Sequence, residues 1–135
     1  MPENKNSKSI KNQIIEIIRN RGHNVIKYSY YRCKIDKKFD VKILYSLRWN
    51  YDRTWYSGHT IRGFVNIYKN NSFILFAFDD AETVLIVPIE EVKKMISNNN
   101  FGVYHIFEKD GQYFTRQSQG GLNLTEYLNN YGQFV

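Results

Sequence analysis

An aspartate and a lysine two positions apart, Asp40 and Lys42, are the pair in this chain best spaced to do chemistry together. On a β-strand this spacing puts both side chains on one face. A carboxylate beside an ammonium can hold a divalent cation and stabilise charge on a phosphate oxygen, which is the chemistry of metal-dependent phosphodiester cleavage. Mg²⁺ prefers more than one carboxylate, and the candidates for the second acid are Asp36 and Glu16.

If the chain is catalytic, we therefore expect Mg²⁺ as its cofactor, with Asp40 and Asp36 as metal ligands. The expected catalytic residues are Asp40, Lys42 and Glu16. The alternative is that Asp40 and Lys42 belong to an ordinary ion pair on a solvated strand.

Positive charge is concentrated in the first half of the chain. Residues 1–69 hold fifteen lysines and arginines against five acids, whereas residues 70–135 hold four against eight. Aromatic residues are interleaved with these bases: Tyr28, Tyr30, Tyr31, Tyr45, Trp49, Tyr51, Trp55 and Tyr56. Cations neutralise phosphates and aromatic rings stack on bases, so the pattern favours a nucleic-acid partner. The plainer interpretation is that the lysines are solvated and the tyrosines are half-buried strand residues.

The expected nucleic-acid contacts come from this basic and aromatic stretch. They are Lys27, Arg32, Lys34, Lys37, Lys38, Arg48, Arg53, Trp55 and Arg62.

Bulk composition limits the class of protein. A chain of 135 residues with 42% hydrophobic residues is expected to be one domain, 1–135, with a frayed polar tail over 1–8. The single cysteine and the absence of a signal-peptide pattern predict an intracellular, cytoplasmic protein. The longest apolar run, 84–89, is too short to cross a membrane, so no membrane partner is expected.

Apolar periodicity predicts an α+β fold. Ile10, Ile14, Ile17 and Ile18 recur at the helical period, and Gly22 ends that first helix. A middle helix is expected after Pro88 and a short C-terminal helix over 124–130. Strands are expected over 24–31, 39–49, 53–62, 64–68, 73–78, 83–87, 103–107 and 112–116. They predict one mixed or antiparallel sheet of about six to eight strands.

Two turns and one irregularity complete this expectation. Residues 50–52 are expected to turn between strands, and 69–72 to close a hairpin between 64–68 and 73–78. Gly58 is expected to form a bulge inside the strand 53–62.

The order of these elements resembles the PD-(D/E)xK nuclease superfamily, in its small restriction-like and intron-associated homing branch. The likeness is carried by a helix with an acid, the D-x-K strand, and the stretch FAFDDAETVLIVPIEEV over residues 76–92. The resemblance implies a restriction-endonuclease-like core, a Mg²⁺ site on a strand, and DNA rather than RNA as substrate. By the same resemblance Asp40 and Lys42 are the (D/E)xK pair and Glu16 is the helix acid. The segment 28–32, where the family's earlier metal-binding aspartate is expected, has no acid.

Three functions remain open at this level. The first is a Mg²⁺-dependent DNA endonuclease, which at this size would act as a homodimer to cut both strands. The second, suggested by the missing acid, is a non-catalytic DNA- or RNA-binding module that is regulatory, anti-defence or a reader of modified bases. The third is an adaptor whose cationic surface meets an acidic protein.

Overall fold

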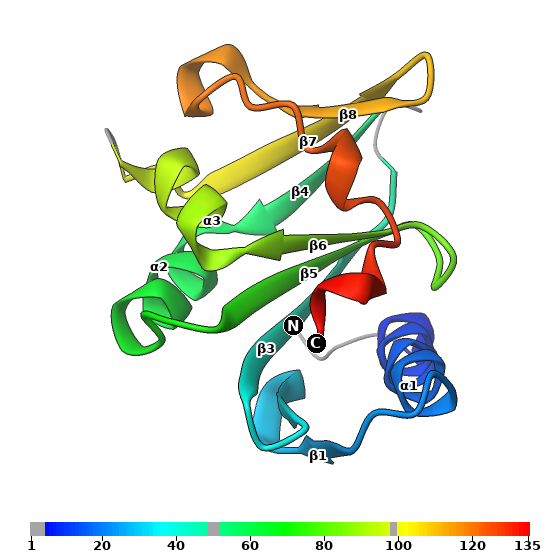
Figure 1. Ribbon diagram of the computed structural model, residues 1–135. Coiled ribbons are helices and arrows are strands. Elements are labelled where there is room, and N and C mark those ends of the chain that lie inside the picture. Colours follow the sequence, from blue (N-terminus) through cyan, green and yellow to red (C-terminus); the bar gives the residue numbers. More distant parts are fainter. Residues whose placement is uncertain (1–4, 49–51, 98–99) are drawn as a thin grey trace.

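The computed structural model describes residues 5–48, 52–97 and 100–135, which form three α-helices and eight β-strands (Figure 1). The helices are α1 (Lys5–Asn20), α2 (Gly58–Ile67) and α3 (Ile89–Ile96). The strands are β1 (Val25–Lys27), β2 (Arg32–Ile35), β3 (Phe39–Ser46), β4 (Arg53–Ser57), β5 (Ser72–Phe78), β6 (Val84–Pro88), β7 (Val103–Lys109) and β8 (Gln112–Thr115). Four short 3₁₀ segments are η1 (Ser29–Tyr31), η2 (Gln117–Gln119), η3 (Thr125–Tyr127) and η4 (Tyr131–Gln133).

The strands form two sheets. The first is mixed, with the order β1-β2-β3-β5-β6, and the second is antiparallel, with the order β4-β7-β8. In the first sheet β3 and β5 run parallel and the other neighbours run antiparallel. The α+β class and the number of strands are confirmed, whereas the expectation of a single sheet is wrong.

The main error in the expected elements falls between β3 and β5. Strands were expected over 53–62 and 64–68, but β4 ends at Ser57 and α2 occupies the rest. The buried positions of α2 lie three and four residues apart, at Ile61, Phe64 and Val65, which is helical spacing. Parallel strands need a long crossover, and α2 belongs to the connection between β3 and β5. The hairpin expected at 69–72 is therefore also absent.

Local chemistry explains why α2 starts where it does. Ser57 caps the helix by accepting a hydrogen bond from the Thr60 backbone N–H at 3.3 Å. Gly58 then donates its backbone N–H to the Gly102 carbonyl at 2.9 Å. A Cβ atom at Gly58 would lie 2.0 Å from the Phe101 carbonyl oxygen, so a larger residue does not fit there. This close approach, rather than a bulge, accounts for the glycine.

The strand expected over 24–31 is wrong beyond β1, because η1 and the unexpected strand β2 follow. The other expected elements are mostly confirmed. The first helix begins at Lys5, so residues 5–8, expected in the frayed tail, are helical. The middle helix follows Pro88, and the last two strands form the expected hairpin. At the C-terminus there is only the 3₁₀ segment η3 where a short helix was expected. Expectations for residues 49–51 and 98–99 lie outside the described residues.

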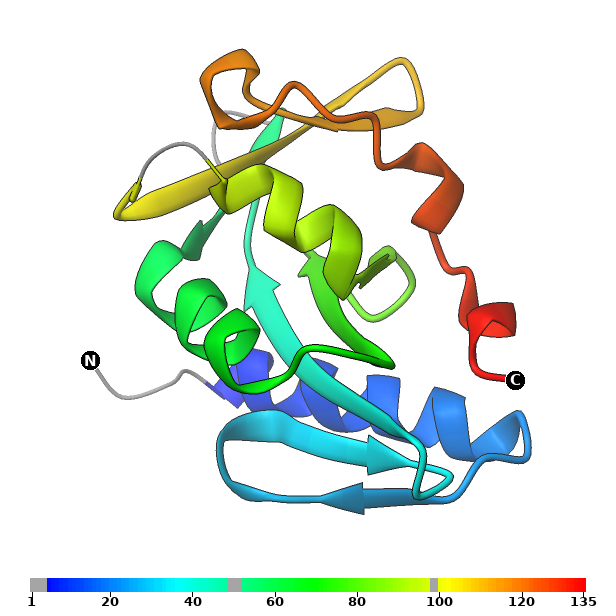
Figure 2. The same ribbon diagram turned by 60° about the vertical axis from the view of Figure 1, so that its left-hand side comes forward.

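The first sheet has a hydrophobic core on each face. The α1-side core contains Ile14, Ile18, Val41, Ile43 and Leu75 among its buried residues. The α3-side core lies between the opposite face, α2, α3 and the second sheet, and contains Ile74, Phe76, Leu85, Val92 and Tyr104. Figure 2 shows α1 beside the β1–β2 hairpin and α2 and α3 on the other side of β5. No helix in the described part of the chain is long and apolar enough to cross a membrane.

Candidate functional site

The predicted pair, Asp40 and Lys42, lies on β3 where that strand pairs with β2. The register puts Lys34 opposite Asp40 and Arg32 opposite Lys42. Asp40 Oδ1 lies 2.9 Å from Lys34 Nζ, and this hydrogen bond raises the pKa of Lys34. Lys42 Nζ donates a hydrogen bond to the Tyr30 carbonyl. Asp40 therefore forms an ion pair with the cation across the ladder.

Asp36 fixes the turn between β2 and β3. Its carboxylate accepts a hydrogen bond from the Asn24 backbone N–H at 2.8 Å and lies 2.6 Å from His23 Nδ1. The hydrogen bond from His23, followed by that from Asn24, lowers the pKa of Asp36. This carboxylate thus ties the β2–β3 turn to the segment that joins α1 to β1.

Glu16 lies on the solvent side of α1, where its carboxylate is 2.8 Å from the Arg19 guanidinium. Because α1 packs on the face of β3 that carries Val41 and Ile43, the alternating Asp40 side chain lies on the other face. The structure therefore does not bring Glu16 and Asp40 together.

These acids do not fit a magnesium site. The two proposed metal ligands, Asp40 and Asp36, already accept hydrogen bonds from different partners. Within residues 5–48, 52–97 and 100–135 no group of three or more His, Cys, Asp or Glu side chains is placed to hold a metal ion. Mg²⁺ needs oxygen ligands that converge, and the side chains facing Asp40 and Lys42 from β2 are cations instead.

Cations and tyrosine rings meet around η1 at this end of the first sheet, on both of its faces. Lys27 lies opposite Cys33 on the α1 side, whereas Arg32 and Lys42 lie with Asp40 on the other side. Lys11 and Lys27 lie 5.1 and 4.4 Å from the centre of the Tyr31 ring. Lys42 lies 5.9 Å from the centre of the Tyr30 ring. These distances are within the range of cation–π attraction.

Arg32 makes the same kind of contact with two more rings. Its guanidinium lies 5.8 Å from the Tyr28 ring centre and 5.9 Å from the Tyr68 ring centre. A cavity of about 270 Å³ opens here, lined by these three residues with Lys34, Asp40 and Cys33. We call the following residues the cation–tyrosine surface: Lys11, Lys27, Arg32, Lys42, Tyr28, Tyr30, Tyr31 and Tyr68.

The backbone that presents two of these tyrosines is strained. Tyr30 and Tyr31 have φ angles of 60° and 55°, in the left-handed region that bulky residues rarely adopt. Tyr30 is also 86% exposed, so its own burial does not stabilise this conformation. Strain of about 1–3 kcal/mol per residue, held by surrounding structure, is typical of functional sites.

The other expected nucleic-acid contacts separate into two groups. Lys37 and Lys38 lie on the turn between β2 and β3, two strands that also carry residues of the cation–tyrosine surface. Lys38 Nζ donates a hydrogen bond to the Val135 carbonyl at 2.6 Å. Arg48 pairs with Glu108, and Arg62 donates to the Phe101 carbonyl at 2.6 Å. Arg53 pairs with Asp52 at 3.3 Å. Arg48 and Arg62 thus tie parts of the fold together, whereas Arg53 pairs with its neighbour in the chain.

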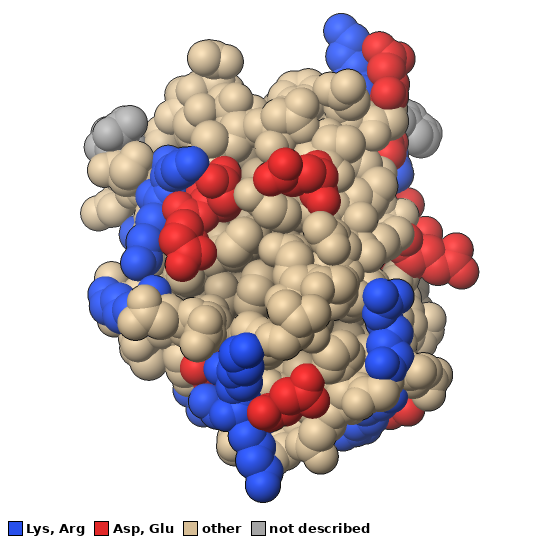
Figure 3. Space-filling view, viewed as in Figure 1, with Lys and Arg blue, Asp and Glu red and all other residues tan. Residues whose placement is uncertain are grey.

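The space-filling view is consistent with this division. Figure 3 shows basic side chains over the lower end of the molecule, where Figure 1 places β1, with an acidic group among them. Most acidic groups on this face lie in its upper half. Because Arg48 and Arg62 bond to Glu108 and to the Phe101 carbonyl, the basic residues of the first half of the chain do not all belong to the cation–tyrosine surface.

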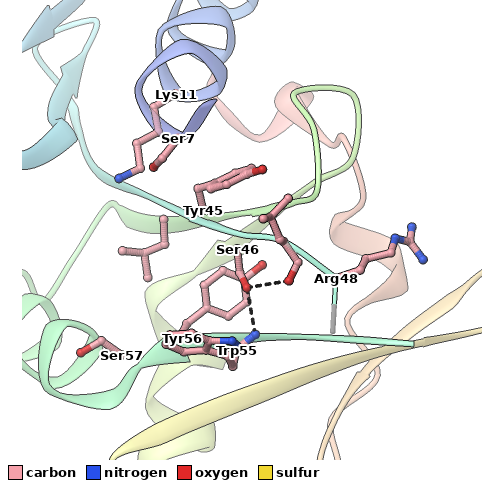
Figure 4. A pocket seen from close by; sticks show the side chains of 10 residues that line it. Ser7, Lys11, Tyr45, Ser46, Arg48, Trp55, Tyr56 and Ser57 are labelled. Atoms are coloured by element: carbon pink, nitrogen blue, oxygen red, sulfur yellow. Dashed lines mark hydrogen bonds between the residues drawn. The ribbon is translucent and has the colours of Figure 1, made fainter. Parts of the chain in front are cut away.

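A larger pocket, of about 530 Å³, lies between α1, the end of β3 and β4 (Figure 4). Its lining residues are Ser7, Lys11, Leu44, Tyr45, Ser46, Leu47, Arg48, Trp55, Tyr56 and Ser57. Trp55 is 52% exposed at its wall. The sequence indicated Trp55 as a contact, but it gave no sign of a pocket, because the walls come from three separate elements.

Comparison with known proteins assigns no family, because no protein-family model and no curated protein matches this chain. The function must therefore be argued from the geometry of the site.

Proposed function

We propose that this chain binds nucleic acid through the cation–tyrosine surface and does so without a metal-dependent cutting step. The observation that supports this most is the set of cation–ring contacts at exposed rings: Lys42 and Arg32 each lie within 6 Å of the ring centre of Tyr30 and Tyr28, respectively. Lys11 and Lys27 add positive charge beside the buried Tyr31 ring. Proteins that bind single-stranded nucleic acid without strong sequence preference combine cations for the backbone with rings for the bases.

The exposed tyrosines support the same proposal. Tyr30 and Tyr28 are 86% and 45% exposed, although each lies in cation–π contact. A ring already held beside a cation loses less conformational freedom when a base stacks on it. The strained and exposed ring of Tyr30, beside Lys42, is more readily explained by a ligand than by folding.

DNA is the first ligand to test, because the resemblance to the PD-(D/E)xK nucleases, carried by Asp40, Lys42 and the stretch 76–92, implies DNA rather than RNA. The ion pair between Asp40 and Lys34 is the reason to propose binding rather than cleavage. Without a cutting step, the proposal does not require a homodimer.

The test is a titration of a labelled 20-base-pair duplex, once with EDTA and once with Mg²⁺. We expect binding in both buffers that weakens steeply with salt, and DNA that stays intact. If the DNA is cleaved in Mg²⁺, and if Asp40→Ala and Lys42→Ala each abolish this cleavage, the result supports the nuclease alternative instead. The proposal fails if no duplex or single strand, of DNA or RNA, binds even at low salt.

A further inference from the structure

We infer that the pocket between α1 and β4 holds one unpaired base of the nucleic acid, so that the preferred ligand carries a single-stranded or bulged nucleotide. This inference rests on the proposed function and adds the class of ligand. It starts from a gap in the first sheet. The pairing of β2 with β3 ends at Lys42, but β3 continues to Ser46.

Beyond Lys42 no described strand pairs with β3 on the side away from β5. Instead β4 leaves for the second sheet, and a hydrogen bond from its backbone to the Ser46 side chain connects it to the end of β3. The Trp55 backbone N–H donates to Ser46 Oγ at 3.2 Å, and Ser46 Oγ donates to the Leu47 carbonyl at 3.0 Å (Figure 4). The pocket thus lies where the two sheets separate, and the hydrogen bonds of Ser46 hold this part of its lining in place.

The walls suit a flat aromatic guest. Trp55 and Leu47 are 52% and 54% exposed, and both line the pocket, with Leu44 also part of the lining. Ser7 and Ser57 add hydroxyl groups for the polar edge of a base. A volume of about 530 Å³ lies within the range of about 300–1,000 Å³ typical of small-molecule sites.

The charge of the lining favours an anionic ligand. None of the described lining residues is acidic. Of the two basic lining residues, Arg48 is balanced by Glu108, so the positive charge of the lining comes from Lys11. An extended protein segment along the β3 edge is the competing occupant. The free edge from Ile43 to Ser46 is short for such a pairing, and Trp55 offers a stacking surface instead.

The pocket is continuous with the cation–tyrosine surface at two points. Lys11 both lines the pocket and lies 5.1 Å from the Tyr31 ring centre. Leu44 follows Lys42 by two residues on the same face of β3. A strand held by the cations therefore passes the mouth of the pocket. A base within a duplex cannot enter such a pocket unless it leaves the stack, so an unpaired base enters at lower cost.

The experiment compares three fluorescent DNA probes by anisotropy: a perfect 20-base-pair duplex, the same duplex with one bulged adenosine, and one of its single strands. We expect the bulged and single-stranded probes to bind about 5- to 150-fold more tightly than the duplex, the range that one stacking contact gives. Trp55→Ala should lower the affinity for the bulged and single-stranded probes about 5- to 150-fold more than the affinity for the duplex, and should leave the part of the preference that the Tyr30 ring supplies. Trp55→Phe should keep more of the preference, because a ring remains.

The matched control is Phe114→Ala, which removes a ring of the second sheet that does not line the pocket. It should keep the preference, and thermal melts of each variant check that it is folded. If Trp55→Ala weakens all three probes equally, the base pocket is refuted while the proposed function stands. If the three probes bind the wild-type protein alike, both the base pocket and base stacking on Tyr30 are refuted, and binding rests on the cations alone. If a polyglutamate peptide binds in a Trp55-dependent way while the probes bind alike, the pocket belongs to a protein partner and the inference is also refuted. If no probe binds, the proposed function fails as well.

Discussion

Asp40 is the residue whose expected role differs most between a Mg²⁺-dependent nuclease and a non-catalytic nucleic-acid-binding protein. As a metal ligand it would need a second carboxylate, but its oxygen lies 2.9 Å from Lys34 Nζ. In a binding surface its charge works against the ligand, because it neutralises a neighbouring cation. The same side chain therefore has opposite expected effects on DNA affinity under the two accounts.

Asp40→Asn should tighten DNA binding. The change releases Lys34 and adds one positive charge to the surface, and we expect about two- to fivefold higher affinity at 0.1 M salt, the size of one exposed charge pair. Anisotropy titration of the 20-base-pair duplex measures it. Glu90→Gln, an exposed acid on α3, is the control and should leave affinity unchanged. Weaker binding by Asp40→Asn would contradict the binding role.

Tyr30→Gly should weaken single-strand binding while leaving the stability of the fold nearly unchanged. Glycine adopts a φ of 60° without steric cost, and the 86% exposed ring buries little apolar surface. The free energy of unfolding should therefore change by less than about 1 kcal/mol, because relief of strain offsets the greater freedom of the unfolded chain. Single-strand affinity should fall about 5- to 150-fold with the loss of one stacking ring.

Urea unfolding and anisotropy measure these two quantities. Tyr30→Phe keeps the ring and should bind as the wild type does. If the Tyr30→Gly variant binds the single strand with wild-type affinity, the Tyr30 ring does not take part in binding.

Between elements, one network joins the end of β3 to the second sheet. The Arg48 guanidinium pairs with Glu108 on β7, and Tyr113 Oη on β8 donates to Glu108 Oε2 at 2.5 Å. The hydrogen bonds from Arg48 and then from Tyr113 lower the pKa of Glu108. Burial and this carboxylate raise the pKa of Tyr113 to about 12. The network holds the second sheet against the region that forms the pocket.

Glu108→Gln should destabilise the fold in a pH-dependent way. Because the folded pKa of Glu108 is lowered, its stabilisation is present above the ordinary carboxyl value and is lost as the pH falls through the folded value. At pH 7 we expect a loss of about 1–3 kcal/mol, typical of hydrogen bonds to a charged group. Between pH 3 and 7 the urea midpoint of unfolding should vary less with pH for Glu108→Gln than for the wild-type protein. A wild-type pH profile for Glu108→Gln would contradict this role, and Glu90→Gln is the control.

The sequence predicts some elements well because their pattern follows directly from burial. β5 and β6 are buried on both faces, so their continuous apolar runs are clear. α2 was missed because Ile61, Phe64 and Val65 are typical strand residues, and their helical spacing is evident only over two turns. β2 was missed because its basic residues alternate with only two buried ones, Cys33 and Ile35.

The omission of β2 explains why the partners of Asp40 and Lys42 were predicted wrongly. Without β2, no pattern could indicate that Lys34 lies opposite Asp40 or that Arg32 lies opposite Lys42. The pairing of Asp36 with His23, thirteen residues apart, depends in the same way on the folded turn. Tyrosines in the left-handed region at η1 are likewise set by tertiary contacts, because tyrosine has no preference for that conformation.

At the scale of the whole molecule, the basic residues of the first half serve two purposes. Lys11, Lys27, Arg32 and Lys42 meet tyrosine rings and form the cation–tyrosine surface. Arg48 instead bonds to Glu108 of the second sheet, and Arg62 of α2 bonds to the Phe101 carbonyl. Charge asymmetry along the chain therefore overstates the size of the binding surface.

The salt dependence of DNA binding tests the cation–tyrosine surface most directly. Wild-type protein should give a slope of about −4 in log affinity against log salt, as expected if about four or five phosphates are contacted. Lys27→Ala with Arg32→Ala should reduce the magnitude of the slope by about 1.8, because two contacts are removed. The control, Lys93→Ala with Lys109→Ala, removes two cations outside the surface and should keep the wild-type slope. Equal slopes for all three proteins would contradict the account.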